Sequence, residues 1–208
     1  MLEVKNTVDA QVDTTVNPRG QYFEAGAVVL NRKTITAYSG LSERAHKEAA
    51  LLWQKATGYD LVLFDTNDFD QHRLHHTSHL LFIGTGTYLT FLPLIITESF
   101  PIKGYALVAP DLIIESDRKR VLDRLLSDGL TLIELASEQV FNFVTHAAEI
   151  PLEGNQHALL LSTTAFTSLK PNQVEQLKQF VVDIQHVDLS TLELLGGGSV
   201  VSIINQLF

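Results

Sequence analysis

Short apolar runs alternate with amphipathic stretches along most of the chain. After Gly26, two runs rich in β-forming residues, 27–30 and 34–38, flank a short polar turn, which predicts a hairpin. Apolar residues at helical spacing follow and stop at Gly58, and residues 59–64 again have the pattern of a strand. The pattern predicts a unit of strand, strand, helix and strand.

The same order of elements recurs further along the chain. The elements expected in the second and third units are strands at 79–83, 88–92, 105–108 and 130–135 with a helix at 117–127, then strands at 157–161 and 184–189 with a helix at 171–181. Residues 196–208, a glycine-rich turn and an apolar run, look like the first strand of a fourth unit. Repetition of one supersecondary unit roughly every 50 to 60 residues is typical of propellers and solenoids.

Composition narrows the class of protein. The 208 residues are 45% hydrophobic and 19% charged, as in ordinary globular proteins, and the net charge of −9 argues against binding to nucleic acid through its phosphates. The first residues lack the basic start and apolar stretch of a signal peptide, so we expect a cytoplasmic protein that does not enter a membrane. We expect an N-terminal arm at 1–21 and one domain at 22–208.

The chain contains no cysteine, which excludes disulfides, thiolate ligands and a thiol nucleophile. Residues 65–79 hold four histidines and three aspartates, and metal-dependent chemistry at His72, His75, His76 and His79 is one hypothesis. Their spacing fits no familiar metal-binding template, so a polar loop before a strand is the favoured interpretation. The glycines at 84–86 and 196–198 do not form a phosphate-binding motif, and we expect no metal and no other cofactor.

Three polar residues stand where chemistry could occur. His76 lies at the mouth of a predicted strand, where it could act as a general base or simply cap the strand. Glu24 precedes Gly26 at another strand entrance, where it could orient a base or remain a solvated carboxylate. Ser202 sits in the apolar run after three glycines, a type of turn that delivers a nucleophile in several enzyme architectures.

Three segments, FEAGAVVLNR…AYSGLSER, HHTSHLLFIG and LLGGGSVVSI, occur in an order that resembles the guanidine-modifying superfamily. This superfamily includes arginine deiminases, dimethylarginine dimethylaminohydrolases and amidinotransferases, and the arginine-deiminase-related citrulline hydrolases are the most similar. The resemblance runs from about residue 22 to the C-terminus. It implies an α/β fold of the pentein type, a β/α-propeller of five strand-strand-helix-strand modules.

The resemblance also implies roles for particular residues. Glu24 takes the place of the family's acidic residue, His76 that of its catalytic histidine, and Ser202 that of the cysteine that attacks the guanidinium carbon. The glycine-rich turn before that position implies ligand contacts at Gly197, Gly198 and Ser199.

The chain departs from the family in ways that bear on activity. Serine replaces cysteine at 202, Val201 stands where arginine is common, and Ser78 replaces an asparagine. Only about twenty residues precede Glu24, so we expect an incomplete propeller. The leading hypothesis is a catalytically inactive relative, a pseudoenzyme that binds a small guanidino or amino-acid ligand or another protein. The alternative is a hydrolase of arginine-like C–N bonds with Ser202 as nucleophile, His76 as base and Glu24 as its orienter.

Exposed strand edges in an incomplete propeller favour association with other chains. We therefore expect a homo-oligomer, or a partner chain that completes the ring.

Overall fold

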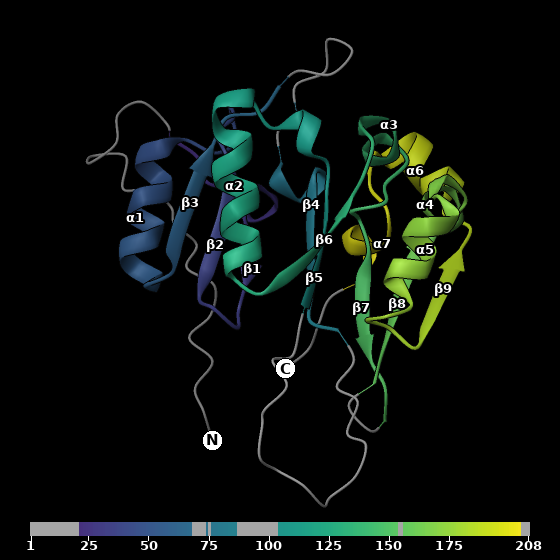
Figure 1. Ribbon diagram of the computed structural model, residues 1–208. Helices are drawn as coiled ribbons and strands as arrows, with labels where there is room; N and C mark the ends of the chain where they lie inside the picture. The colour runs from purple at the N-terminus through teal and green to yellow at the C-terminus, as the bar shows by residue number, and fades with distance from the viewer. Residues whose placement is uncertain (1–20, 68–73, 75, 87–103, 154–155, 205–208) are drawn as a thin grey trace, which may run out of the picture.

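The structure, a computed structural model, describes residues 21–67, 74, 76–86, 104–153 and 156–204. The expected strand at 88–92 and almost all of the expected arm at 1–21 lie outside these residues. Figure 1 shows the described residues as three small sheets side by side, with helices packed against them. The strand orders are β1-β2-β3, β4-β5-β6 and β7-β8-β9, so each sheet is built from strands that are consecutive in the chain.

The three sheets share one pattern of pairing. In each, the first two strands are antiparallel and the last two are parallel. A parallel pair needs a crossover connection, and a helix supplies it in every module. The elements of the first module are η1 (Ala25–Ala27), β1 (Val29–Asn31), β2 (Thr36–Gly40), α1 (Lys47–Thr57) and β3 (Asp60–Phe64).

The second and third modules repeat this order with additional short helices. The second contains η2 (Thr77–His79), β4 (Leu81–Gly84), β5 (Gly104–Val108), η3 (Pro110–Leu112), α2 (Glu115–Ser127) and β6 (Leu130–Glu134). The third contains α3 (Ser137–Phe141), β7 (Ala148–Pro151), β8 (His157–Ser162), α4 (Thr163–Ser168), α5 (Pro171–Leu177) and β9 (Asp183–Val187). The predicted module of strand, strand, helix and strand is therefore confirmed three times.

Neighbouring modules are joined where a helix lies along the last strand of the module before it. Arg124 of α2 forms an ion pair with Asp60 of β3 at 2.6 Å, and Arg120 donates to the Leu63 carbonyl at 2.6 Å. Gln173 of α5 donates to the Glu134 carbonyl at the end of β6 at 2.7 Å. One continuous apolar core runs through the described modules, and every residue of β5 is buried. The described modules form no closed ring, in keeping with the expected incomplete pentein propeller.

One expectation about local structure is wrong. The run after the three glycines is not a strand: it forms α7 (Val200–Ile203), which follows α6 (Ser190–Gly196). The backbone N–H of Ser202 donates to the Ser199 carbonyl at 2.9 Å, so the run coils into one helical turn that buries Val200 and leaves the other residues exposed.

Within the described parts of the chain, no helix is both long and apolar enough to cross a membrane.

Candidate functional site

Two of the predicted site residues meet at the start of the first module. The Nε2 atom of His76 lies 3.0 Å from Oε2 of Glu24. An ionised carboxylate only accepts hydrogen bonds, so in this pair Nε2 carries the proton and, in the neutral ring, Nδ1 keeps its lone pair. A carboxylate that holds an imidazole in one tautomer in this way is the arrangement that orients a general base.

Small residues and a buried threonine set this geometry. A Cβ on Gly26 would lie 2.8 Å from Nδ1 of His76, so only glycine lets the imidazole lie against the backbone of η1. Thr77 follows His76 and is 2% exposed; its hydroxyl donates to the Ala27 carbonyl and accepts from the N–H of Gly40, both at 2.7 Å. These bonds fix the start of η2 against η1 and hence His76 beside Glu24.

Arg44 adds a positive charge to the pair. Its Nη1 lies 3.3 Å from the same Glu24 oxygen that His76 contacts, and the Glu24 N–H donates to the Arg44 carbonyl at 3.1 Å. The hydrogen bond with His76 and the charge of Arg44 lower the pKa of Glu24 below its ordinary value of 4.5. The carboxylate is 41% exposed, so solvent reaches it. Glu24 is therefore ionised near neutral pH.

Two more histidines extend the site toward the third module. The ring of His79 lies 5.4 Å from that of His76 and 4.7 Å from that of His146. His146 comes from the turn after α3, in which Phe143 adopts a left-handed backbone with φ of 62°, an uncommon conformation for a bulky residue. The hydroxyl of Thr145 donates to the His79 carbonyl and ties this turn to η2.

His146 is held neutral by its surroundings. His146 is only 5% exposed, and its Nδ1 atom has no hydrogen-bond partner among the described residues. Burial lowers the pKa of His146 to about 4, repulsion from His76 lowers it too, and the carboxylate of Glu193 acts in the opposite direction. Near neutral pH the row of rings therefore contains at least one uncharged imidazole.

The glycine turn is anchored by Glu193 of α6. The hydroxyl of Ser199, which is fully buried, donates to Oε1 of Glu193 at 2.7 Å. Gly197 ends α6 in the left-handed conformation, with φ of 65°. A Cβ on Gly198 would lie 2.6 Å from the hydroxyl oxygen of Ser202, so this side chain folds back against the turn.

Glu193 stays ionised although it is 8% exposed. Burial by itself would raise the pKa of Glu193, but hydrogen bonds with Ser162, Ser199 and Thr164 outweigh it and lower that pKa. Its charge also acts on His146, which links the glycine turn electrostatically to the histidines.

The structure brings Glu24 and His76 together and places Ser202 on the exposed side of α7. The roles assigned to these three residues, and to Gly197, Gly198 and Ser199, stay predictions. No group of three or more metal-ligating side chains occurs among the residues the structure describes, and His72 and His75 lie outside them. Sequence reasoning missed His146 and Glu193, because neither stands in a recognisable motif and only the folded chain brings them near the other histidines.

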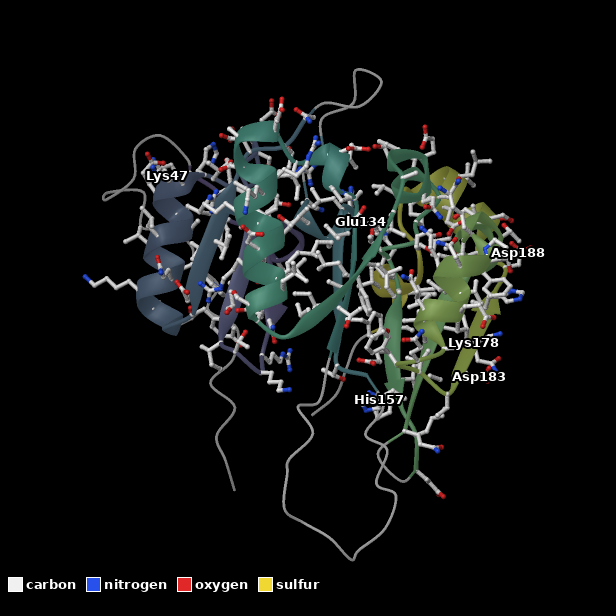
Figure 2. The ribbon with its side chains drawn as sticks, in the orientation of Figure 1. Lys47, Glu134, His157, Lys178, Asp183 and Asp188 are labelled. Carbon is white, nitrogen blue, oxygen red and sulfur yellow. The ribbon has the colours of Figure 1, made fainter. Side chains whose placement is uncertain are left out.

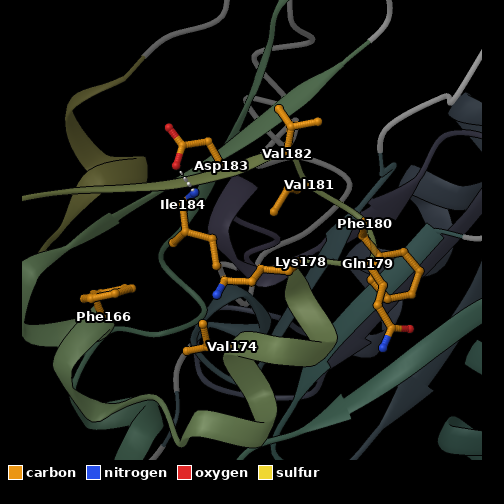
Figure 3. A pocket seen from close by; sticks show the side chains of 9 residues that line it. All are labelled: Phe166, Val174, Lys178, Gln179, Phe180, Val181, Val182, Asp183 and Ile184. Atoms are coloured by element: carbon orange, nitrogen blue, oxygen red, sulfur yellow. Dashed lines mark hydrogen bonds between the residues drawn. The ribbon is translucent and has the colours of Figure 1, made fainter.

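A separate cavity of about 470 Å³ lies between α5 and β9 (Figure 3). Its wall is mainly apolar and includes Phe166, Val174 and Ile184, together with the side chains of Lys178 and Asp183. None of the predicted site residues lines it. Figure 2 shows Lys178 and Asp183 on the outer side of the third module, where Asp188 also lies.

Comparison with known proteins identifies the family of this chain by its sequence and relatives of the same fold by its structure. The family profile described as N,N dimethylarginine dimethylhydrolase, eukaryotic, matches residues 1–208. No curated protein sequence matches the chain.

Among solved structures, the apo arginine dihydrolase ArgZ from the ornithine-ammonia cycle in Cyanobacteria is 16% identical with a TM-score of 0.59, over 85% of this chain and 23% of ArgZ. A cysteine-to-serine mutant of the N-terminal domain of ArgZ, bound to substrate, is 16% identical with a TM-score of 0.58, over 86% of this chain and 54% of that one. A cysteine-to-alanine mutant of AgrE with L-arginine is 15% identical with a TM-score of 0.57, over 84% and 21%. The TM-scores show that this chain shares the fold of these structures, and it spans at most about half the length of these relatives.

Proposed function

This chain belongs to the eukaryotic N,N-dimethylarginine dimethylhydrolase family, and from that premise we propose that it binds a small guanidino or amino-acid ligand without cleaving it. The observation that carries the proposal is the presence of a hydroxyl at position 202, where the family resemblance implies a cysteine, in a chain that retains the Glu24–His76 pair. The family's members are hydrolases of guanidino C–N bonds, which indicates the class of ligand. The loss of activity is inferred from the serine at position 202.

Chemistry supports the loss of activity. A guanidinium carbon is stabilised by resonance, and attacking it near neutral pH needs a strong nucleophile. A thiol with a pKa of about 8.5 becomes a thiolate when a cationic group lies beside it. A serine hydroxyl is far harder to ionise and needs a base within hydrogen-bond reach. The hydroxyl of Ser202 is folded against Gly198.

Two relatives support retained binding. The cysteine-to-serine mutant of the ArgZ N-terminal domain holds its substrate, and the cysteine-to-alanine mutant of AgrE holds L-arginine. In this chain Glu24 is an ionised, solvent-accessible carboxylate, which is the group that pairs with a guanidinium. Loss of the nucleophile and retention of the ligand are thus compatible in this fold.

The test uses the purified protein with L-arginine, N,N-dimethylarginine and L-citrulline. We expect calorimetry to detect binding of at least one of them, and assays for released amine or ammonia to detect no turnover. Ser202→Cys should then gain turnover of the bound compound, whereas Ser127→Cys, an exposed serine of α2, should not. Turnover by the unaltered protein that disappears in Ser202→Ala would overturn the proposal.

A hydrolase remains the second candidate, favoured by one observation. The 3.0 Å contact between Glu24 and His76 is the geometry of an oriented base, and a serine nucleophile needs such a base. This candidate requires turnover by the unaltered protein and its loss in both Ser202→Ala and His76→Ala.

We also propose that the protein associates with itself or with a partner chain. Leu194 and Leu195 of α6 are 84% and 81% exposed, and Val201 and Ile203 of α7 are 46% and 56% exposed. Exposed apolar side chains on two neighbouring helices of the chain favour an interaction site. Sedimentation velocity at micromolar concentration should show a species larger than the 23.1 kDa chain, and a stable monomer would contradict this. The cytoplasmic location stays a prediction from the sequence.

A further inference from the structure

We propose that Glu193 is a positioning residue of the candidate site: its buried carboxylate holds the turn at 196–202 in the place from which that turn meets a ligand. The inference deepens the proposed function and rests on it for the identity of the ligand. Glu193 itself need not touch the ligand, because it acts through the turn.

One carboxylate connects three segments that are separate in the sequence. Glu193 belongs to α6, and Ser199, which donates to it at 2.7 Å, begins α7. Ser162 and Thr164, which help to lower the pKa of this carboxylate, stand where β8 ends and α4 begins. The hydroxyl of Ser162 accepts from the N–H of Ala165 as well and so caps α4. The turn is therefore fastened to the central strand of the third sheet.

The backbone carries this anchoring on to Ser202. The N–H of Gly197 donates to the Glu193 carbonyl at 3.2 Å, so this residue holds the turn through both its backbone and its side chain. The N–H of Ser202 donates to the Ser199 carbonyl at 2.9 Å. Only two hydrogen bonds, one by a side chain and one by the backbone, therefore separate the Glu193 carboxylate from Ser202.

A packing role alone does not account for a carboxylate at this position. Burying a charge is unfavourable unless it is hydrogen-bonded, and a leucine would fill a similar volume without that cost. The buried Ser199 hydroxyl donates to the carboxylate instead, Ser162 and Thr164 also lower its pKa, and its negative charge acts on His146, which packs against His79 of the histidine row. The same group thus fixes the turn and influences the histidine row.

The experiment compares Glu193→Gln, which keeps shape and removes charge, with Ser199→Ala, which cuts the link and keeps the charge. Binding of L-arginine by calorimetry should weaken about tenfold in each variant. The double variant should bind L-arginine with an affinity no lower than that of the single variant with the lower affinity, because both changes break the same connection between Glu193 and Ser199. Glu175→Gln, an exposed carboxylate of α5, is the matched control and should bind like the unaltered protein.

A second measurement needs no ligand. Amide hydrogen exchange at Gly197 and Ser202 should become at least tenfold faster in Glu193→Gln and Ser199→Ala, while Leu159 in the middle of β8 keeps its rate. In a Ser202→Cys background, where the chain has a single thiol, Ser199→Ala should also move the pH midpoint of thiol alkylation toward that of Ser127→Cys.

The outcomes separate the two proposals. Unchanged exchange at Gly197 and Ser202 would overturn the positioning role, and so would an equal increase at Leu159, which would mean a general loss of stability. Faster local exchange in a protein that binds none of the guanidino compounds would leave the positioning role standing and overturn the proposed function. If Glu193→Gln does not fold, Ser199→Ala alone decides.

Discussion

The side-chain amides of Gln139 and Gln173 face each other in the core and exchange two hydrogen bonds, of 2.8 and 3.0 Å. Each Nε2 also donates to a carbonyl, that of Ser168 or Glu134, at 2.7 Å. Each Oε1 also accepts from a backbone N–H near the start of its own helix. Every donor and acceptor of the two amides is satisfied, which makes this pair the polar joint between α3, α5 and the end of β6.

Gln139→Ala should lower the free energy of unfolding by about 2 kcal/mol or more. The change leaves donors and acceptors of the buried Gln173 amide without partners and opens a small cavity. Urea denaturation measures the loss, and Gln139→Ala/Gln173→Ala should cost clearly less than the sum of the single changes. Gln179→Ala, on the exposed side after α5, is the control and should change stability little. Additive losses would show that the two amides do not act as a pair.

Glu24 should titrate below its ordinary value of 4.5 because His76 and Arg44 stabilise its ionised form. A carboxyl pKa depressed in the folded state contributes stability that is present above the unfolded value and is lost as pH falls through the folded value. Carbon-13 NMR of the carboxyl should show the pKa rising toward 4.5 in His76→Phe, and by less in Arg44→Gln. The exposed Glu138 serves as the internal reference. The opposite order of the two shifts would show that Arg44, not His76, dominates.

The repeated module could be predicted from the sequence because its signals are local. Apolar runs marked the strands, and Gly58, in a left-handed conformation, ended α1 as expected. Pro171 stands in the first turn of α5, where its missing N–H costs nothing. The prediction of a C-terminal strand was wrong because a short β-branched apolar run also fits one helical turn, and the side-chain bond from Ser199 to Glu193 at the start of this turn leaves no trace in the hydrophobic pattern.

The site was predictable only in part. Glu24 and His76 stand in motifs that the family resemblance brings together, and the structure places them 3.0 Å apart. The involvement of His146 depends on a turn with an unusual backbone at Phe143, and that of Glu193 depends on the hydrogen bond from the Ser199 hydroxyl. Periodicity carries no information on such contacts, so these residues could not be found before the chain was folded.

His146 should make the protein less stable in mild acid. Its pKa of about 4 lies below the ordinary 6.5, so between these values the unfolded chain binds a proton that the folded chain does not. The free energy of unfolding should therefore fall as pH decreases from about 6.5 to 4, by on the order of 3 kcal/mol at most, and this contribution should level off below 4. His146→Phe should remove most of that slope in denaturation measured across this range. His186→Phe, an exposed ring, should leave the slope in place, and a slope equal in all three proteins would rule His146 out as its source.

Gly198 and Gly196 form a matched pair that tests the glycine turn. A Cβ at 198 would meet the Ser202 hydroxyl at 2.6 Å and its Cβ at 2.9 Å, whereas a Cβ at 196 would meet only the end of Leu192 at 3.3 Å. Gly198→Ala should therefore push the side chain at 202 out of the turn and weaken L-arginine binding at least tenfold, while Gly196→Ala should stay within about twofold of the unaltered protein. Neither glycine has a positive φ, so the difference would come from the contact with Ser202 and not from backbone strain. Equal affinities for the two variants would mean that the position of the Ser202 side chain does not matter to the ligand, and the place of this residue in the candidate site would have to be abandoned.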